Sequence, residues 1–300
     1  MPDLQIDKST FGSVWLVIPV HNRSAVTRRC LAHLQGQNIP SWATVLVIDD
    51  GSTDETSEML RLEFPWVVVH SGDGSLWWGG AIRVGMEISI LRGAGCVCWL
   101  NDDTFPSSHA LETIVHSALQ HEAIVGGVSR TPHPSGFAYA GGLIQRGWPI
   151  TLSPLPTPEA GLTEVAWLHG NMVAVPMTVW QRVGLPEVAW TKQHFADISY
   201  TLKAHRAGIP VLINPAATAE ASWNDSGSYL SWRDAHLPVN TLISGLYNPQ
   251  MWWYLPGFAF FQMHFFGWRG CLRTLWLPIK VLLAATIKYL PRRKVLGLCS

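Results

Sequence analysis

The stretch TVLVIDDGSTD, residues 44–54, decides the fold class of this 300-residue chain. Four consecutive apolar residues run directly into two aspartates, a glycine and a serine. A short apolar run bounded by turn residues is typical of a strand that is buried on both faces of a parallel sheet. Because ligands bind outside the carboxyl ends of such strands, Asp49 and Asp50 lie where chemistry is expected.

The same pattern occurs on both sides of this stretch. The apolar residues 14–18 precede PVHNR, and residues 95–100 precede Asn101-Asp102-Asp103. A further strand is expected at residues 66–70, and helical spacing predicts helices at residues 24–35, 53–62 and 81–91, the second capped by Ser52 or Thr53. Strands that alternate with helices predict an α/β fold with a doubly wound, mostly parallel sheet.

The pattern weakens after the fourth strand. Residues 130–165 are rich in Pro and Gly, and we expect them to run over the surface. Residues 167–175 predict one more strand, and residues 178–183 and 198–206 predict helices.

Composition separates an acidic body from a basic tail. Charged residues make up 14% of the chain, against about 25% in an ordinary soluble domain. No Asp or Glu follows Asp234, so we expect a main domain at residues 12–235 and a helical extension at residues 236–300. The extension carries the basic residues Arg269, Arg273, Lys280, Lys288, Arg292, Arg293 and Lys294.

The tail predicts contact with a membrane surface. Residues 252–268 are apolar but too short and interrupted for a membrane-spanning helix. On a helix, Arg269, Arg273 and Lys280 fall within roughly 40° of one another, and Pro278 is expected to kink or split it. Basic and aromatic residues in this arrangement are typical of a helix that lies in the membrane interface. The alternative is packing on the main domain or between copies in a homo-oligomer.

Other features indicate a protein of the cytoplasm, peripheral to the inner face of the cell membrane. The five cysteines show no zinc-ligand spacing, and the first ten residues lack the basic and apolar regions of a signal peptide. The tail is too apolar for a typical phosphate-binding arm, so no nucleic-acid partner is expected.

Two groups of residues suggest chemistry. Asp102 and Asp103 offer hard oxygen ligands for Mg²⁺ or Mn²⁺. Such an ion neutralises the negative charge that develops on a leaving diphosphate. Asp50 could accept the N–H of a pyrimidine base, His21 could cover the ring, and Arg23 could approach phosphate. Ordinary turn chemistry at strand ends is the alternative for both groups.

Taken together, these stretches resemble the inverting family 2 glycosyltransferases, which have the GT-A fold. The resemblance rests on VIPVHN (17–22), IDDGSTD (48–54) and LNDD (100–103), and it covers roughly residues 12–235. Residues 72–81, GDGSLWWGGA, are similar to a bacterial branch that includes rhamnosyltransferase-like proteins.

The resemblance implies a metal-dependent enzyme with Mg²⁺ or Mn²⁺ as its cofactor. It implies transfer from a UDP- or dTDP-sugar, with dTDP-rhamnose among the candidates, to a hydroxyl of a glycan or lipid-linked acceptor. A non-catalytic nucleotide-sugar-binding or scaffold protein of the same fold is the alternative. Two departures from the family pattern, Asn101 and Ala196, keep that alternative open.

The resemblance also implies a role for each motif residue. Asp103 is the expected metal ligand, and Asp197 is the expected base that takes the proton of the acceptor hydroxyl. Residues 169–171 resemble the loop between the donor and acceptor sites, which makes His169, Gly170 and Asn171 acceptor candidates. The donor candidates are Pro19, His21, Arg23, Asp50, Trp78, Gly79, Gly80 and Asp102. Core packing is the alternative for Trp78 and for His169, and helix capping is the alternative for Asp197.

Overall fold

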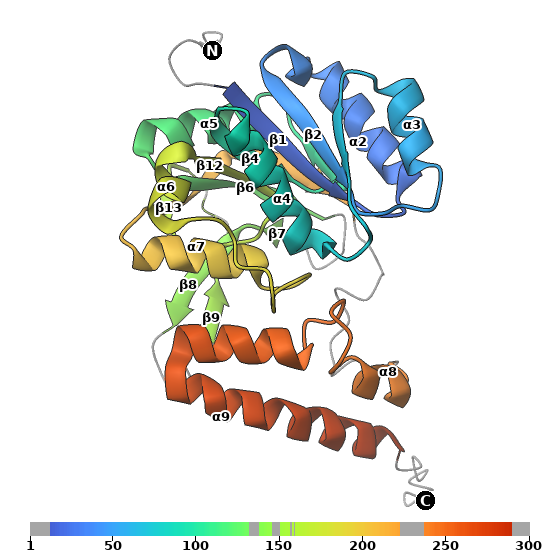
Figure 1. Ribbon diagram of the computed structural model, residues 1–300. Coiled ribbons are helices and arrows are strands. Elements are labelled where there is room, and N and C mark those ends of the chain that lie inside the picture. Colours follow the sequence, from blue (N-terminus) through green and yellow to red (C-terminus); the bar gives the residue numbers. More distant parts are fainter. Residues whose placement is uncertain are drawn as a thin grey trace, which may run out of the picture. The chain divides into compact units, whose positions relative to one another are not determined.

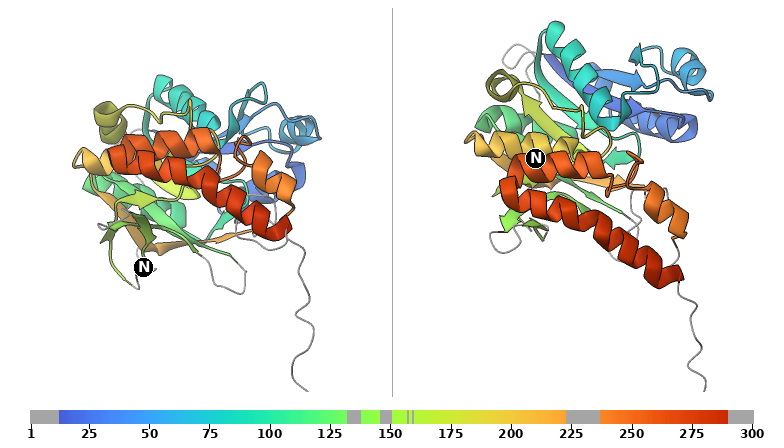
Figure 2. Two further views of the ribbon diagram at one scale, coloured as in Figure 1. Left: turned by 90° about the horizontal axis from the view of Figure 1, so that it is seen from below. Right: turned by 60° about the horizontal axis from the view of Figure 1, so that its bottom comes forward.

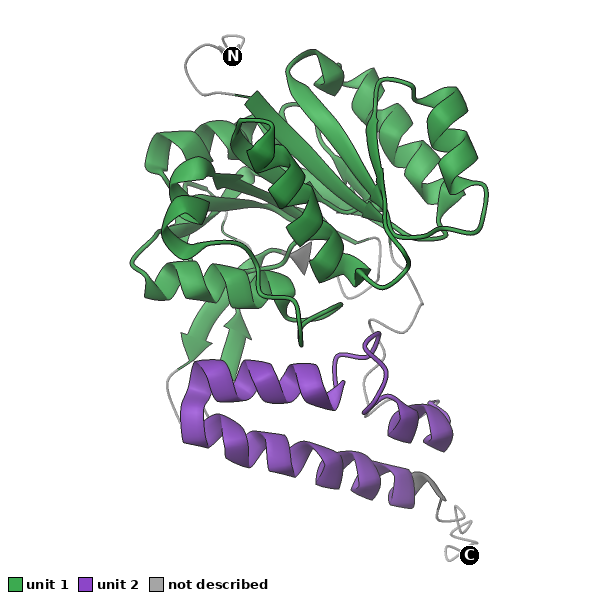
Figure 3. Ribbon diagram, in the orientation of Figure 1, with its two compact units in different colours: residues 1–223 green, residues 224–300 purple. Residues whose placement is uncertain are grey.

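The computed structural model describes residues 13–131, 138–145, 151–156, 158, 160–222 and 237–289 (Figure 1). The chain divides into two compact units, residues 1–223 and residues 224–300 (Figure 3). The expected domain boundary at residues 235–236 lies outside the described residues.

A large mixed sheet forms the frame of unit 1, with the strand order β10-β13-β6-β12-β4-β1-β2-β3. Its centre is parallel and consists of β4 (Ala94–Leu100), β1 (Ser13–Val20), β2 (Ala43–Asp49) and β3 (Val68–Ser71). β12 (Met172–Pro176) runs antiparallel to both β4 and β6 (Ile124–Arg130), and β13 (Val211–Ala221) runs parallel to β6. The predicted α/β class with a doubly wound sheet is confirmed.

Helices cover both faces of this sheet (Figure 1). One face packs against α2 (Ser24–Gly36), α3 (Thr56–Glu63) and α5 (Ala110–His121), and the other against α4 (Trp77–Leu91), α6 (Met177–Val183) and α7 (Ala196–Arg206). The strands serve both cores because successive side chains point to opposite faces. In β1, Leu16 and Ile18 enter the first core, whereas Trp15 and Val17 enter the second.

Residues 130–165 contain more structure than their composition suggested. They include β7 (Ala138–Tyr139), β8 (Gly141–Gln145), β9 (Thr151–Pro154) and β10 (Thr163–Glu164). Outside this segment, the short strand β5 (Thr104–Pro106) pairs with β13.

The prediction of a single strand at residues 167–175 is wrong. It is divided into β11 (Trp167–Leu168) and β12, which belong to different sheets, and residues 169–171 connect them.

The expected N-cap of α3 at Ser52 or Thr53 is also wrong. The helix begins at Thr56, and its N-cap position is Glu55. Other partners take the preceding backbone N–H groups: Asp49 Oδ1 accepts from Ser52 at 3.1 Å, and Asn22 Oδ1 accepts from Thr53 at 2.7 Å. Residues 52–54 are thereby held in a turn.

Unit 2 is helical. It contains α8 (Val239–Ser244) and α9 (Leu255–Tyr289), and Gly267, with φ 55° and ψ −136°, interrupts α9. The arms on either side, residues 255–266 and 268–289, fold back along one another (Figure 2). The kink expected at Pro278 is wrong, because Pro278 lies inside the second arm and the break is at Gly267, a residue that tolerates positive φ.

The second arm of α9 has two different faces. Leu277, Val281 and Ala285 are buried in a core with α8 and Trp253. The opposite face bears the exposed residues Trp268, Leu272, Leu275, Trp276, Ile279, Leu282, Leu283 and Ile287. Most of them are three or four residues apart and two pairs are adjacent in sequence, so all eight fall on one broad face of the helix, which we call the apolar stripe. Counted as one element across its break at Gly267, α9 is the one helix among the described residues that is long and apolar enough to cross a membrane, by length and composition only.

Candidate functional site

Three parallel strands end at the same edge of the sheet in unit 1. In the register of the sheet, Val20 at the end of β1 pairs with Asp49 at the end of β2, and Val17 of β1 pairs with Trp99 of β4. The residues that follow these strands therefore lie near one another, as expected for a ligand site in an α/β sheet.

Asp49 and Asp50 are neighbours in sequence but bind different groups. The Asp49 carboxylate accepts from Ser57 Oγ at 2.6 Å, which ties β2 to α3. The Asp50 carboxylate accepts the backbone N–H of Gly74 at 2.9 Å and that of Trp77 at 2.8 Å. Asp50 thus holds the turn that leads into α4, where Trp77 adopts a left-handed φ of 58°, a conformation uncommon for a large side chain.

The loops after β1 and β2 are joined beside Asp50. His21 Nδ1 lies 2.6 Å from the carbonyl oxygen of Asp50. Pro19 pairs with Ile48 in the sheet. The residues predicted to surround a base, Pro19, His21 and Asp50, are therefore adjacent.

Arg23 connects this region to the acidic pair at the end of β4. Its Nη2 lies 2.9 Å from Asp103 Oδ2, and its Nε lies 3.3 Å from Asp102 Oδ2. Thr27 Oγ1 donates to the same Asp102 oxygen at 3.1 Å. Both carboxylates are buried, and burial raises the pKa of Asp102 to about 7 against the opposing charge of Arg23.

The donor set of Asp102 and Asp103 fits a hard divalent cation in its chemistry. Carboxylate oxygens are the ligands that Mg²⁺ and Mn²⁺ prefer, and substrate phosphates commonly complete the shell. Among the described residues, no group of three or more His, Cys, Asp or Glu side chains surrounds a common point. A cation held here would therefore depend on ligands from a diphosphate.

Trp78 contacts residues on both sides of the site: Asn101, which precedes the acidic pair, and Gly170, which follows β11. Its indole N–H donates to Asn101 Oδ1 at 2.8 Å, and its ring meets Trp99 edge-on at 6.0 Å between centroids. A Cβ added to Gly170 would collide with the six-membered ring of Trp78. Trp78 thus has structural contacts on several sides and still keeps partial exposure.

Asp197 lies directly beyond Gly170. Its Oδ2 accepts the backbone N–H of Gly170 at 2.8 Å, and its Oδ1 accepts that of Ile198 at 2.8 Å. The N-cap position of α7 is Phe195, so the alternative that Asp197 caps the helix is wrong; Asp197 lies in the first turn. Each of its carboxylate oxygens keeps a second lone pair, so these contacts are compatible with a chemical role.

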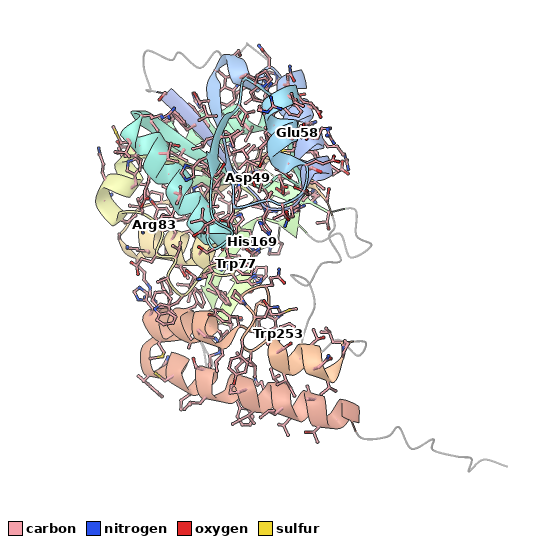
Figure 4. All side chains as sticks on the ribbon, turned by 45° about the vertical axis from the view of Figure 1, so that its right-hand side comes forward. Asp49, Glu58, Trp77, Arg83, His169 and Trp253 are labelled. Atoms are coloured by element: carbon pink, nitrogen blue, oxygen red, sulfur yellow. The ribbon has the colours of Figure 1, made fainter. Side chains whose placement is uncertain are left out.

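The acceptor candidates flank the same point. His169 meets the Trp167 ring edge-on at 5.1 Å, and burial lowers its pKa, so the imidazole is neutral at pH 7. Asn171 is buried, and its backbone carbonyl accepts the N–H of Asn101 at 3.1 Å. Figure 4 labels Asp49, Trp77 and His169 among the side chains of this region.

Gly79 and Gly80 have a packing explanation within the protein. A Cβ on Gly79 would lie 2.8 Å from the carbonyl oxygens of Thr191 and Lys192, and the Gly79 N–H donates to Lys192 O at 2.6 Å. A Cβ on Gly80 would lie 3.2 Å from Leu76 Cβ. Close contact between these glycines and a donor stays a prediction.

Comparison with known families agrees with this geometry. Residues 15–161 match the model of the family described as "Glycosyl transferase family 2". The chain carries a glycosyl transferase family 2 domain. Comparison with curated protein sequences gives no significant match.

Solved structures show the fold of this glycosyl transferase family 2 domain. A crystal structure of GalNAc-T7 with UDP, GalNAc and Mn²⁺ has a TM-score of 0.60 at 14% identity, over 74% of this chain and 46% of that one. A structure of S. aureus TarS 1-349 in complex with UDP-GlcNAc has a TM-score of 0.55 at 15% identity, over 84% of this chain and 72% of that one. The chain thus spans under half the length of the first of these.

The sequence did not predict that some residues of this glycosyl transferase family 2 domain lie at the candidate site. Gln193 Oε1 accepts the backbone N–H of Trp78 at 3.2 Å, and Thr27 binds Asp102 from the middle of α2. Asn101 departs from the family pattern, and its side-chain oxygen accepts the indole N–H of Trp78. Only the folding of α2 and of residues 191–197 brings these groups to the site.

Proposed function

We propose that the chain is an inverting glycosyltransferase that moves a sugar from a nucleotide-diphosphate donor to a hydroxyl of a glycan or lipid-linked acceptor. One observation carries the proposal: Asp50, the Asp102–Asp103 pair and Asp197 are joined by a short series of contacts through Trp77, Trp78, Asn101 and Gly170. These contacts support the proposal because they join the carboxylates for which we propose base binding, cation binding and proton acceptance.

In this proposal the nucleoside end of the donor lies by Pro19, His21 and Asp50, and Asp197 takes the proton of the acceptor hydroxyl. The hydroxyl oxygen attacks the anomeric carbon as the bond to the diphosphate breaks, so one displacement inverts the configuration. Asp103, with Asp102 beside it, would hold a divalent cation, which would supply positive charge against the leaving diphosphate. We expect an oxocarbenium-like transition state, in which the positive charge on the sugar is greatest.

UDP-sugars are the first donors to test, because the two solved structures with this fold contain UDP or UDP-GlcNAc. dTDP-rhamnose is the second, because residues 72–81 resemble the rhamnosyltransferase-like branch. The test uses the full chain with Mg²⁺ or Mn²⁺ and a panel of UDP- and dTDP-sugars. Thermal shift measures binding, and slow release of free nucleotide measures turnover.

The same panel separates catalysis from binding alone. We expect at least one donor to raise the melting temperature and to be hydrolysed only when the metal is present. A donor that binds without turnover in any condition, with the Asp197→Asn variant behaving like the wild type, would support the scaffold alternative.

We further propose that unit 2 attaches the protein peripherally to an anionic membrane surface, such as the inner face of the cell membrane. The apolar stripe exposes two tryptophans and six aliphatic side chains on one face of α9. Arg269 is exposed and Lys280 is partly exposed on the same arm, and the chain has no acidic residue after Asp234. Apolar insertion combined with positive charge favours anionic lipid, and it agrees with a lipid-linked acceptor.

A further inference from the structure

Arg23 lies between two carboxylates that are adjacent in sequence and buried. The Arg23 side chain keeps 33% of its exposure, whereas Asp102 keeps 4% and Asp103 keeps 12%. These two contacts each reach an Oδ2 atom, so one guanidinium bridges the two acidic groups. A positive charge at this point offsets the repulsion between two carboxylates removed from water.

The bridging position is the one that a divalent cation would need. A guanidinium and a metal ion repel each other, and charge interactions are strong at a buried site because water screens them little. The two cations therefore compete for the oxygens of Asp102 and Asp103.

The backbone around Arg23 allows its side chain to move without unfolding α2. Arg23 occupies the N-cap position, and its carbonyl oxygen accepts the N–H of Thr27 at 2.9 Å. The helix start is thus held by the main chain, while the flexible and partly exposed side chain carries the charge. Released from the carboxylates, a guanidinium is well suited to bind phosphate oxygens.

We propose that Arg23 is an internal counter-cation that a divalent metal ion displaces from Asp102 and Asp103, and that it then binds the diphosphate of the donor. This inference rests on the proposed function. It predicts that the metal alone binds weakly to the wild type, because it must first displace Arg23. It also predicts that metal and nucleotide diphosphate strengthen each other's binding, since the diphosphate provides the released guanidinium with a new partner.

A structural ion pair makes the opposite prediction. If Arg23 only stabilised the fold, its removal would lower the melting temperature equally with and without metal. It would not tighten metal binding.

The experiment compares the full-length wild type with Arg23→Gln and with Arg28→Gln as the matched control. Arg28 is on the same helix and forms an exposed ion pair with Glu63 at 2.8 Å, away from the acidic pair. Mn²⁺ alone is titrated into each protein by calorimetry, with its free fraction checked by electron paramagnetic resonance. Melting temperatures with and without Mn²⁺ show whether each variant is folded.

We expect Arg23→Gln to bind Mn²⁺ about tenfold or more tightly than the wild type, because a competing charge is gone. Its melting temperature should fall without Mn²⁺ and recover with it, and Arg28→Gln should match the wild type in Mn²⁺ affinity. Titration of UDP in the presence of Mn²⁺ should show weaker binding to Arg23→Gln, with Arg23→Lys in between.

Equal or weaker Mn²⁺ binding by a folded Arg23→Gln overturns the inference, and so does an unchanged affinity for UDP. These failures are distinct from failure of the proposed function. The proposed function fails if the wild type neither binds nor turns over any donor, whatever the behaviour of Arg23.

Discussion

The backbone N–H of Gly170 donates to Asp197 Oδ2 at 2.8 Å, and the ring of Trp78 fills the space where a side chain on Gly170 would lie. Asp197 is thereby fixed at the start of α7 with its carboxylate turned toward residues 169–171. This arrangement gives the expected base a defined position before any substrate binds, which favours general-base catalysis.

Replacing Asp197 with Asn should lower sugar transfer by about 100-fold or more, because the amide cannot accept the proton of the acceptor hydroxyl. The amide oxygen can still accept the Gly170 N–H, but the amide N–H₂ leaves the Ile198 N–H without its acceptor, so we expect a folded variant with a lower melting temperature. Initial rates of product formation measure the loss, and UDP affinity by calorimetry should remain near that of the wild type. Comparable losses of transfer and UDP binding would indicate a structural role.

Replacing Gly170 with Ala should destabilise unit 1 by about 1–3 kcal/mol, because the new methyl group overlaps the Trp78 ring. Urea unfolding followed by circular dichroism measures this free energy. Gly36→Ala is the matched control, since nothing lies within 4 Å of a Cβ added there. Equal stability of the two variants would contradict the packing of Trp78 on Gly170.

Replacing Asp50 with Asn should cost about 1–3 kcal/mol of folding stability even without a donor. The amide oxygen can accept one of the N–H groups of Gly74 and Trp77, but the amide N–H₂ leaves the other without its acceptor. Thermal or urea unfolding of the apo protein measures this loss. If only UDP binding changed and stability did not, Asp50 would serve the base rather than the turn before α4.

His169 should make stability depend on pH below about 6.5, the ordinary pKa of histidine. Burial lowers its pKa in the folded state, so the unfolded chain binds the proton first and gains stability as the pH falls. The free energy of unfolding should therefore decrease from pH 6.5 downward until the folded-state pKa is passed. His169→Asn should lose that part of the slope, which urea midpoints measured at several pH values can show.

Removing the apolar stripe should release the protein from membranes. The double variant Trp276→Glu and Leu283→Glu places charges at two exposed positions of the stripe. Binding to vesicles that contain phosphatidylserine should fall by about tenfold or more. Leu91→Glu is the control, because Leu91 is 86% exposed on unit 1.

Sedimentation of the full chain with vesicles, with and without phosphatidylserine, measures that binding. Deletion of residues 250–300 should abolish it. If either variant sedimented with the vesicles as fully as the wild type, the proposal that the apolar stripe binds membranes would be wrong.

The apolar runs allowed the centre of the sheet to be predicted from the sequence. Residues 14–18, 44–48 and 95–100 lie within β1, β2 and β4, because a strand buried on both faces must be continuously apolar. The break in α9 was assigned to Pro278 although it occurs at Gly267. A proline can remain inside a helix when tertiary packing holds it, and Leu277 and Val281, on either side of Pro278, are buried in the core of unit 2.

The strand ends at which the candidate site lies were predictable from the sequence, whereas the contacts between its residues were not; the roles of those residues stay predictions. Asp50 and Asp103 could be singled out because each comes just after an apolar run that predicts a strand, and such a run is a local feature of the sequence. The bridging of Asp102 and Asp103 by Arg23, and the contact of Trp78 with Gly170, join segments 79 to 92 positions apart. Such pairings depend on how helices settle on the sheet, which no local pattern encodes.

The position of Trp78 has a kinetic consequence. Its indole N–H donates to Asn101, the residue before Asp102 and Asp103, and its ring packs against Gly170, which binds Asp197. In the proposed function, the donor and the acceptor would both bind beside residues that Trp78 contacts. A smaller residue at position 78 should therefore change the Michaelis constants of donor and acceptor together. Any replacement of Trp78 that lets the protein accept more acceptors should also make it less selective among donors.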